Sequence, residues 1–434
     1  MTRFVGLDVH KRVVEVCILA ESGERLWRGR VDCTREALQA FVEEQLEATD
    51  QLALEATTNT WAVVDLLAPA VARVVVSNPL RTKAIASAKV KTDKVDARIL
   101  AELLRCDYLP EVWQPDTETR RLRSLTHRRA SLVGDRTAVK NRLHSTLAQR
   151  LIPVPYAKLF SKKGLTWLSE LELDEDGRQM IDSDLRLLES TETEIAALEA
   201  LLAPLAYQRQ QVRLLMTLPG VHSATAQALM AAWGDISRFP DPDRAASYLG
   251  LVPSTRQSAS RCYHGRITKQ GNSHARWLLV QAAQHVANNP GPLGVFFRRL
   301  SKKKGRNIAV VATARKLATI AWHLLRNQEP YRYAMPVATQ NKLAQLRVQA
   351  TGQKRRRGPA KGTRRSTAYG TGNATRRRRS LHEVYDNEQL PRAKSLQELD
   401  PGERRALQAL GVIAFVQDLQ QAKHLPKKTA KAQS

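Results

Sequence analysis

The first eighty residues of the chain alternate between short apolar stretches and longer stretches with helical spacing. A two-residue period predicts strands at residues 3–9, 13–20 and 25–31, short apolar runs predict buried strands at 52–54 and 71–76, and the helical spacing predicts helices at 34–48 and 59–67. Strands that come first and are followed by an alternation of helix and strand are typical of a mixed sheet covered by helices. We therefore expect an α/β domain at the N-terminus.

The pattern becomes helical after this domain. From Thr117 to Leu151 apolar residues recur at intervals of seven and four, and a second long helix is predicted from Ser183 to Leu205. In the second helix Leu188, Ile195 and Leu202 occupy one heptad position. These stripes favour coiled-coil pairing, either between the two helices or with another protomer, although ordinary bundle packing gives the same pattern.

A third, mainly helical part is predicted to start at the Pro219-Gly220 turn, before a helix at 224–232. This turn resembles a helix-hairpin-helix element, in which backbone N–H groups at a helix start bind phosphate, but a plain interhelical turn fits equally. Residues 254–261 are expected to form a polar loop, and a helix is predicted from Ser273 to Asn288.

The C-terminal part has a different composition. Residues 351–380 are rich in Gly, Thr, Lys and Arg with almost nothing apolar, so we expect a disordered basic tail that binds nucleic acid through counterion release. A modest helical pattern returns at 403–420. The expected domains are 1–108 (α/β), 109–207 (helical coiled-coil region), 208–332 (small, mainly helical) and 333–434 (basic, largely disordered).

The charge balance points to a polyanionic partner. The 434 residues contain 69 Lys and Arg against 42 Asp and Glu, a formal net charge of +27, which favours nucleic acid over a membrane and over a merely solubilising surface. The four cysteines form no CxxC pair, so neither a zinc knuckle nor a disulfide framework is indicated. The N-terminus does not resemble a signal peptide, and Arg315 and Lys316 interrupt the apolar run at 308–325. We expect a cytoplasmic protein.

Four acids are candidate metal ligands. Asp8 is expected at the end of the first strand and Glu55 at the end of the fourth, so the two carboxylates share a sheet edge if those strands are neighbours. Asp93 and Asp96 open a predicted helix and lie on one of its faces. Carboxylate oxygens suit Mg²⁺ or Mn²⁺, and two such ions could promote displacement at phosphorus. Taken singly, each acid is better explained as a helix cap, a turn residue or a surface acid; taken together, the four acids fit a metal site equally well.

Other candidates are a serine nucleophile and a set of phosphate-binding groups. The serine hydroxyls of the predicted polar loop, Ser254, Ser258 and Ser260, could attack a phosphodiester whose charge nearby cations offset, although the residues alone favour a plain polar loop. No local His and Asp pair indicates a hydrolase triad. The candidate nucleic-acid contacts are Arg128, Arg129, Lys140, Arg142, Gly220, Arg256, Arg261, Arg266 and Lys269.

Separated motifs, taken together, resemble one family. They are Gly6-Leu7-Asp8-Val9-His10-Lys11, Leu54-Glu55-Ala56-Thr57, Lys91-Thr92-Asp93-Lys94-Val95-Asp96-Ala97-Arg98, Leu218-Pro219-Gly220-Val221 and Leu249-Gly250-Leu251-Val252-Pro253. Their order and spacing over residues 3–330 resemble the DEDD insertion-sequence transposases, which are bridge-RNA-guided recombinases.

The resemblance implies more than the residues alone. It implies a RuvC-like, RNase H-type N-terminal domain, Mg²⁺ held by Asp8, Glu55, Asp93 and Asp96, and Ser258 as the nucleophile that forms a phosphoserine link to DNA. It also implies dimers that pair into tetramers, with sites built from one protomer's acids and another's serine. A structured guide RNA would specify donor and target DNA.

The preferred hypothesis is therefore a DNA transposase or recombinase associated with the bacterial nucleoid. One alternative is a Holliday-junction or flap nuclease that uses the same acids to hydrolyse DNA. A second alternative is a non-enzymatic architectural protein that binds nucleic acid.

Overall fold

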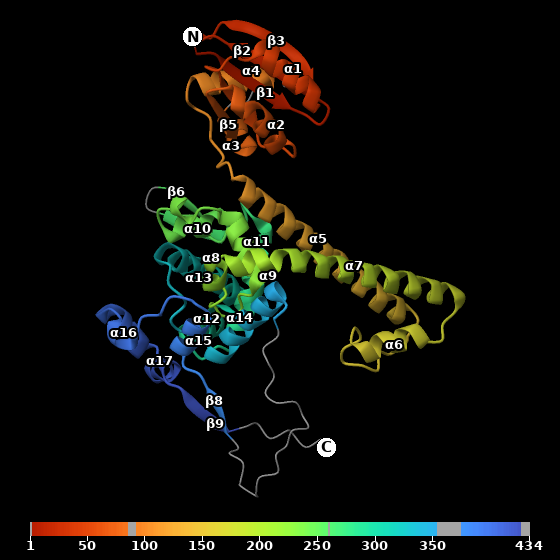
Figure 1. Ribbon diagram of the computed structural model, residues 1–434, viewed down its shortest axis with the longest axis vertical. Coiled ribbons are helices and arrows are strands. Elements are labelled where there is room, and N and C mark those ends of the chain that lie inside the picture. The colour runs from red at the N-terminus through yellow and green to blue at the C-terminus, as the bar shows by residue number, and fades with distance from the viewer. Residues whose placement is uncertain (1, 86–92, 259–260, 354–374, 427–434) are drawn as a thin grey trace, which may run out of the picture. The chain divides into compact units, whose positions relative to one another are not determined.

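The computed structural model describes residues 2–85, 93–258, 261–353 and 375–426. The chain forms two compact units, Met1–Asp116 and Thr117–Ser434 (Figure 1). The predicted segments 208–332 and 333–434, and all but the first few residues of 109–207, belong to the second unit.

The first unit contains a five-stranded mixed sheet with the strand order β3-β2-β1-β4-β5. β1 is antiparallel to β2, and β2 to β3, whereas β1, β4 and β5 run parallel. The predicted mixed sheet is thus confirmed. The elements are β1 (Phe4–Val9), β2 (Val13–Leu19), β3 (Arg25–Asp32), α1 (Arg35–Gln45), β4 (Gln51–Glu55), α2 (Thr60–Leu67), η1 (Ala68–Ala70), β5 (Arg73–Ser77), α3 (Pro79–Ile85) and α4 (Asp93–Arg105).

Each face of this sheet is covered by helices, as alternation along the strands requires. Val5, Leu7 and Val9 of β1 pack with residues of α1 and α2 on one face. Phe4 points to the other face, where the apolar side of α4 covers the sheet. The two cores together bury both faces of the central strands. Because side chains alternate along a strand, these cores also determine on which face of the sheet a polar residue at a strand end lies.

The second unit is mainly helical. Its helices are α5 (Thr117–Gln149), α6 (Lys162–Glu170), α7 (Glu175–Gln208), α8 (Gln210–Leu215), α9 (Ser223–Trp233), η2 (Ile236–Arg238), α10 (Pro242–Tyr248), α11 (Ser273–Val286), α12 (Pro292–Lys304), α13 (Arg306–Asn327), α14 (Pro336–Thr351), α15 (Leu381–Asn387), η3 (Leu396–Glu398), α16 (Pro401–Ala409) and α17 (Ile413–Gln420). Two short hairpins complete it, β6 (Pro253–Ser258) with β7 (Arg261–Ile267), and β8 (Thr375–Arg378) with β9 (Lys423–Pro426).

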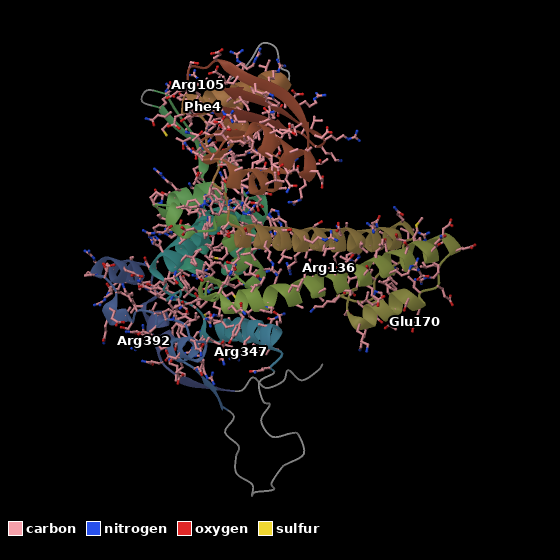
Figure 2. All side chains as sticks on the ribbon, turned by 45° about the horizontal axis from the view of Figure 1, so that its top comes forward. Phe4, Arg105, Arg136, Glu170, Arg347 and Arg392 are labelled. Atoms are coloured by element: carbon pink, nitrogen blue, oxygen red, sulfur yellow. The ribbon has the colours of Figure 1, made fainter. Side chains whose placement is uncertain are left out.

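The long helices α5 and α7 pack side by side along much of their length (Figure 1). Val139 of α5 lies in one buried cluster with Leu188 of α7, and Leu122 lies in another with Leu202. Of the two expected pairings, the structure contains the one between the two helices of the same chain. Figure 2 shows side chains along the whole length of this pair, with Arg136 labelled on α5.

The helix α13 is long and apolar enough to cross a membrane by length and composition alone. Its apolar residues instead form the centre of the second unit's core, where Leu317 and Ala321 are completely buried. Trp322 donates a hydrogen bond from Nε1 to the carbonyl oxygen of Phe239 at 3.1 Å. These contacts are those of a core helix.

The expectation of a polar loop at 254–261 was wrong. Its described residues belong to an antiparallel hairpin in which Arg256 pairs with Tyr263 and Ser258 with Arg261. The strand β6 has no apolar alternation because its residues beyond Pro253 are exposed on both faces. Backbone pairing with β7 therefore supports a strand that periodicity could not predict.

The expectation of a largely disordered C-terminal extension was also wrong for most of its length. Tyr385 is completely buried, and its hydroxyl donates a hydrogen bond to the carbonyl oxygen of Tyr331 at 2.6 Å. Leu381 and Val384 are buried beside it. A few well-placed apolar residues thus anchor the extension, although its average composition is basic and polar. Residues 354–374, the centre of the predicted basic tail, lie outside the described residues.

Candidate functional site

Asp8 and Glu55 lie at the ends of two neighbouring parallel strands. The register pairs Leu7 of β1 with Leu54 of β4, so the two acids are the next residue on each strand. Alternation fixes their direction: Leu7 and Leu54 pack toward α1 and α2, so both acids point to the face covered by α4. The two carboxylates therefore emerge at the same end and on the same face of the sheet.

The helix α4 runs over this face with its N-terminus at the acidic end. At its other end, Arg105 Nη1 donates to the carbonyl oxygen of Glu21, which follows β2. The labelled Phe4 and Arg105 lie near each other in Figure 2, at the end of β1 opposite to Asp8. The first turn of α4, which contains Asp96, consequently lies at the end of the sheet where Asp8 and Glu55 emerge.

Gly6 determines how closely α4 approaches β1. A Cβ atom placed on Gly6 would lie 2.0 Å from the carbonyl oxygen of Ala97 and 2.6 Å from the amide nitrogen of Ala101. No residue other than glycine fits without a shift of the helix. Asp96 directly precedes Ala97, so this contact positions Asp96 relative to Asp8, two residues beyond Gly6 on the same face of β1.

The structure brings together part of the predicted set of metal ligands, and their metal-binding role stays a prediction. Asp8 and Glu55 are brought together and Asp96 lies at the same end of the sheet, while the side chain of Asp93 lies outside the described part of the structure. Among the described residues no three His, Cys, Asp or Glu side chains gather closely enough to hold a metal ion. All of the donors are carboxylates, the ligand type that Mg²⁺ and Mn²⁺ prefer.

Two further residues at this end were not predicted. His10 Nε2 lies 3.1 Å from Asp8 Oδ2. Glu15 is the cross-strand partner of Asp8 on β2, is almost completely buried, and accepts a hydrogen bond from Arg30 Nε at 2.7 Å. Directly opposed carboxylates repel each other, and the guanidinium of Arg30 offsets the charge of Glu15. The strand pattern of residues 13–20 could have indicated Glu15 if the hairpin register had been assumed.

Ser258 is the last residue of β6 and is exposed. Its cross-strand partner is Arg261, and the pair two residues further from the tip is Arg256 with Tyr263. Residues two apart on a strand share a face, as do cross-strand partners. Ser258 therefore shares one face of the hairpin with two arginines and with Tyr263, whose exposed fraction is 66%. This face offers a hydroxyl flanked by cations and an exposed aromatic ring.

The neighbouring serines differ from Ser258. Ser254 is near the base of the hairpin, where its hydroxyl donates a hydrogen bond to the carbonyl oxygen of Arg266 at 3.2 Å. A Cβ atom on Gly265 would lie 2.5 Å from Ser254 Oγ, so this contact is close. Ser260 lies outside the described residues. The geometry favours Ser258 over Ser254 as an accessible hydroxyl.

The base of the hairpin is held by a compact turn. Gly271 has a φ of +84°, and a Cβ atom there would lie 2.1 Å from the carbonyl oxygen of Tyr248. Arg276 of α11 donates a hydrogen bond to the carbonyl oxygen of Leu249 at 2.9 Å. Lys269 lies in the same turn and Arg266 on β7, and both are exposed. The turn ties the hairpin to the helical core.

The predicted phosphate contacts on α5 divide into two groups. Arg129 donates from Nε to Glu199 at 3.0 Å, and Lys140 and Arg142 form ion pairs with α7 carboxylates at 3.2 and 2.7 Å. These three cations therefore connect α5 to α7. Arg128 is exposed and belongs to none of these pairs. Of the four, Arg128 is the one whose geometry leaves it most available for a phosphate.

The Pro219-Gly220 turn is packed within the helical core. Gly220 has a φ of +74°, and a Cβ atom there would lie 2.3 Å from the carbonyl oxygen of Ala282 in α11. The buried Lys342 of α14 donates from Nζ to the carbonyl oxygens of Leu218 and Val221 at 2.7 and 3.0 Å. Burial lowers the pKa of Lys342 to about 7. The glycine thus has a clear packing role, and its predicted role in phosphate binding stays a prediction.

Two histidines meet where α5 crosses α11. The rings of His127 and His274 are arranged edge to face, with 5.6 Å between their centroids. Burial, followed by the charges of His127 and Arg129, lowers the pKa of His274 to about 4. His274 is therefore neutral at physiological pH.

Two family models match the chain at the places where these features lie. One, described as a transposase of the DEDD IS110 type, matches residues 5–152, and the other, described as the IS116/IS110/IS902 transposase family, matches residues 212–293. Together they cover more than half of the chain. The chain belongs to the IS110 family of DEDD transposases. The first match contains the four predicted acids, and the second contains Ser258.

Curated relatives of this IS110-family chain are distant in sequence but match more than half of it. A putative transposase, y4qE, from Sinorhizobium fredii is 27% identical over 74% of this chain and 78% of its own length. A transposase for insertion sequence element IS1111A from Coxiella burnetii is 28% identical over 56% of this chain and 68% of its own length. A pilin gene-inverting protein from Moraxella bovis is 26% identical over 76% of this chain and 97% of its own length. Family membership makes this chain a DNA transposase or recombinase.

Proposed function

We propose that this IS110-family protein cuts and rejoins DNA through a covalent link between Ser258 and a DNA phosphate, assisted by a divalent metal ion at the acidic end of the N-terminal sheet. The observation that carries the proposal is the hairpin face on which Ser258 lies between Arg256 and Arg261. A serine with a free hydroxyl and two flanking cations is suited to displacement at a phosphodiester.

The covalent step conserves the number of phosphodiester bonds. The Ser258 oxygen forms a bond to phosphorus, the bond from phosphorus to one sugar oxygen breaks, and that oxygen takes the serine proton. Arg256 and Arg261 offset the negative charge that develops on the phosphoryl oxygens. In the reverse step, a hydroxyl from another strand attacks the phosphoserine, and the proton returns to serine. Strands are exchanged in this way without net hydrolysis.

The acids would hold the metal ion. Asp8 and Glu55 at adjacent strand ends, with Asp96 in the first turn of α4 and Asp93 at its start, supply only oxygen donors. A bound Mg²⁺ or Mn²⁺ would polarise the phosphodiester and stabilise a leaving oxygen. His10 beside Asp8, and the Arg30–Glu15 pair, orient the acids and limit their mutual repulsion.

The remaining parts of the proposal concern architecture and partners. The strand order and directions of the N-terminal sheet are those expected for an RNase H-like, RuvC-like domain. The α5–α7 pair would act as a coiled coil that supports dimers and tetramers. A structured guide RNA would select donor and target DNA, in association with the nucleoid, and the net charge of +27 is compatible with binding both nucleic acids.

The test is the capture of a covalent protein–DNA adduct. Incubation with DNA that carries the element ends, guide RNA and Mg²⁺ should give an adduct that survives denaturation, and peptide mass spectrometry should locate the phosphate on Ser258. Ser258→Ala should abolish the adduct, whereas Ser254→Ala should retain it. An adduct of undiminished yield in Ser258→Ala would refute the assignment.

The same experiment separates recombination from the nuclease alternative. A nuclease that uses the acids and water releases free 5′-phosphate ends whether or not Ser258 is present. The relation to a pilin gene-inverting protein favours recombination, because inversion requires rejoining. Free ends produced by Ser258→Ala would support the nuclease instead.

A further inference from the structure

The part of the chain that contains the serine hairpin and the helices α11, α12 and α13 has no acidic residue. Between Asp243 and Glu329 the chain has no Asp or Glu, and the exposed cations gather where α12 ends and α13 begins. We name this surface the α12–α13 basic corner and define it as Arg299, Lys302, Lys303, Lys304 and Arg306. It lies outside both segments that match the family models.

The geometry of the corner keeps its charges together. Gly305, with a φ of +86°, ends α12 and starts α13, so the cations on both sides of it belong to one sharp turn. Within the described residues none of the five cations forms an ion pair. Lysines in the last turn of α12 are favoured by the negative end of the helix dipole. That dipole offsets only part of their mutual repulsion, so an external polyanion would stabilise this surface.

A cavity of about 640 Å³ adjoins the corner. Its apolar wall includes Leu293, Phe296 and Ile320, while Arg299 and Lys316 also line it. This volume lies within the range of roughly 300–1,000 Å³ that is typical of ligand sites. Arg299 belongs to both the corner and the cavity, so a ligand could occupy the two at once.

Two of the three carboxylates that line the cavity, Glu329 and Glu403, are paired with protein groups. Arg332 donates to Glu329 at 2.8 Å and to Glu403 at 2.7 Å, and the Tyr333 hydroxyl also donates to Glu403. Asp400, the remaining carboxylate in the lining, precedes the first turn of α16. With Glu329 and Glu403 paired to Arg332, the cations Arg299 and Lys316 outnumber the one remaining carboxylate, Asp400, in the lining, so an anion is attracted on balance.

We propose that the α12–α13 basic corner and this cavity bind single-stranded nucleic acid, with backbone phosphates on the cations and one unpaired base in the cavity beside Phe296. The choice of nucleic acid rests on the proposed function, since an acidic peptide would also be attracted to the cations. Flat aromatic and apolar walls next to a cationic groove are typical of single-strand sites. A base that is paired within a duplex cannot enter a cavity, so the site discriminates single strands from duplexes.

The phosphate contacts are tested by salt dependence. Fluorescence anisotropy would measure the affinity of the full chain for a labelled 12-nucleotide RNA, for DNA of the same sequence, and for the corresponding duplex, each over a range of salt concentrations. The triple variant K302Q/K303Q/K304Q should weaken single-strand binding at least tenfold and reduce the salt slope by about 2, because each phosphate contact contributes roughly 0.7. The matched control K158Q/K162Q/K163Q also removes three exposed lysines of the second unit and should leave both quantities unchanged.

The cavity is tested separately with two substitutions that fill it, Ile320→Trp and Asn327→Trp. Asn327 is an exposed lining residue, so a larger side chain there should not disturb the core. Each should lower single-strand affinity about tenfold without changing duplex affinity or the salt slope, and thermal unfolding would verify the fold. Equal effects on single strands and duplexes would overturn the base pocket, and an unchanged slope in the lysine triple variant would overturn the phosphate contacts. Selective loss of an acidic peptide would show a protein partner instead. A variant that still forms the Ser258 adduct while failing these tests would refute only this inference.

Discussion

Gly6 of β1 lies directly beneath Ala97 of α4, so closely that a methyl group on Gly6 would meet the carbonyl oxygen of Ala97 at 2.0 Å. The contact joins the strand that ends near Asp8 to the helix that begins with Asp93 and Asp96. Because backbone atoms are on the helix side of the contact, the overlap is relieved only if α4 and β1 move apart.

Gly6→Ala should therefore impair the acidic site without altering any acid. We expect destabilisation by about 1–3 kcal/mol, as is usual for overpacking, and at least a tenfold loss of adduct formation. Urea unfolding and adduct yield would measure the two effects. Gly134→Ala is the matched control, because a Cβ atom on this α5 glycine meets nothing within 4 Å, and it should be neutral or stabilising by up to about 1 kcal/mol. Normal stability and activity in Gly6→Ala would contradict the positioning role.

The two kinds of arginine on α5 should respond differently to substitution. Arg142 pairs with the buried Asp184 of α7, so Arg142→Gln should destabilise the protein by about 1–3 kcal/mol and leave the salt slope of DNA binding unchanged. Arg128→Gln should leave stability unchanged and reduce the salt slope by about 0.9 if Arg128 contacts a phosphate. Thermal unfolding and binding titrations at several salt concentrations distinguish the two. Destabilisation by Arg128→Gln and a reduced salt slope in Arg142→Gln would show that Arg128 is the structural residue and Arg142 the phosphate contact.

The pH dependence of stability should contain a contribution from His274. Its pKa is lowered to about 4 in the folded protein, against 6.5 ordinarily, so between these values the unfolded chain binds more protons. The contribution of His274 to the free energy of unfolding is therefore fully present above pH 6.5 and is lost as the pH falls through 4. The contribution is about 1–2 kcal/mol after allowance for the partial exposure of the ring. Urea unfolding of His274→Gln at several pH values should show a shallower acid limb, and an unchanged limb would exclude this histidine as the cause.

The sequence predicted the N-terminal sheet and the edge position of Asp8 and Glu55, because strand alternation and chain order constrain both. It did not predict Glu15 beside Asp8, since its place depends on hairpin register. The close contact between Gly6 and α4 could not be predicted either, because a glycine in a strand pattern does not indicate which backbone packs against it.

The two wrong predictions, for the β6 strand and for the C-terminal extension, have different physical causes. The β6 strand is polar and exposed on both faces, so no periodicity distinguishes it from a loop, although its pairing places Ser258 opposite Arg261. In the C-terminal extension, Leu381, Val384 and Tyr385 are too few to register in an average over a basic segment. Tertiary burial of these and other apolar side chains of the extension, such as Leu343 and Val416, decides the structure there.

The proposed sharing of a site between protomers predicts complementation. If one protomer supplies the acids and another supplies the serine, an equimolar mixture of Asp8→Asn and Ser258→Ala proteins should recover about a quarter to a half of the wild-type adduct yield, an order-of-magnitude expectation from random assembly. Each variant alone should be inactive. Adduct formation no greater than the sum of the separate variants would indicate that each protomer uses its own acids.

The central claim is that the acids at the sheet edge and Ser258 belong to one reaction. Its most direct test is the yield of the Ser258–DNA adduct in Asp8→Asn and in Glu55→Gln at saturating Mg²⁺, with circular dichroism to verify folding. We predict that both variants fold normally and bind DNA, while the adduct falls by at least a hundredfold in each. Wild-type adduct yield in both variants would contradict the account.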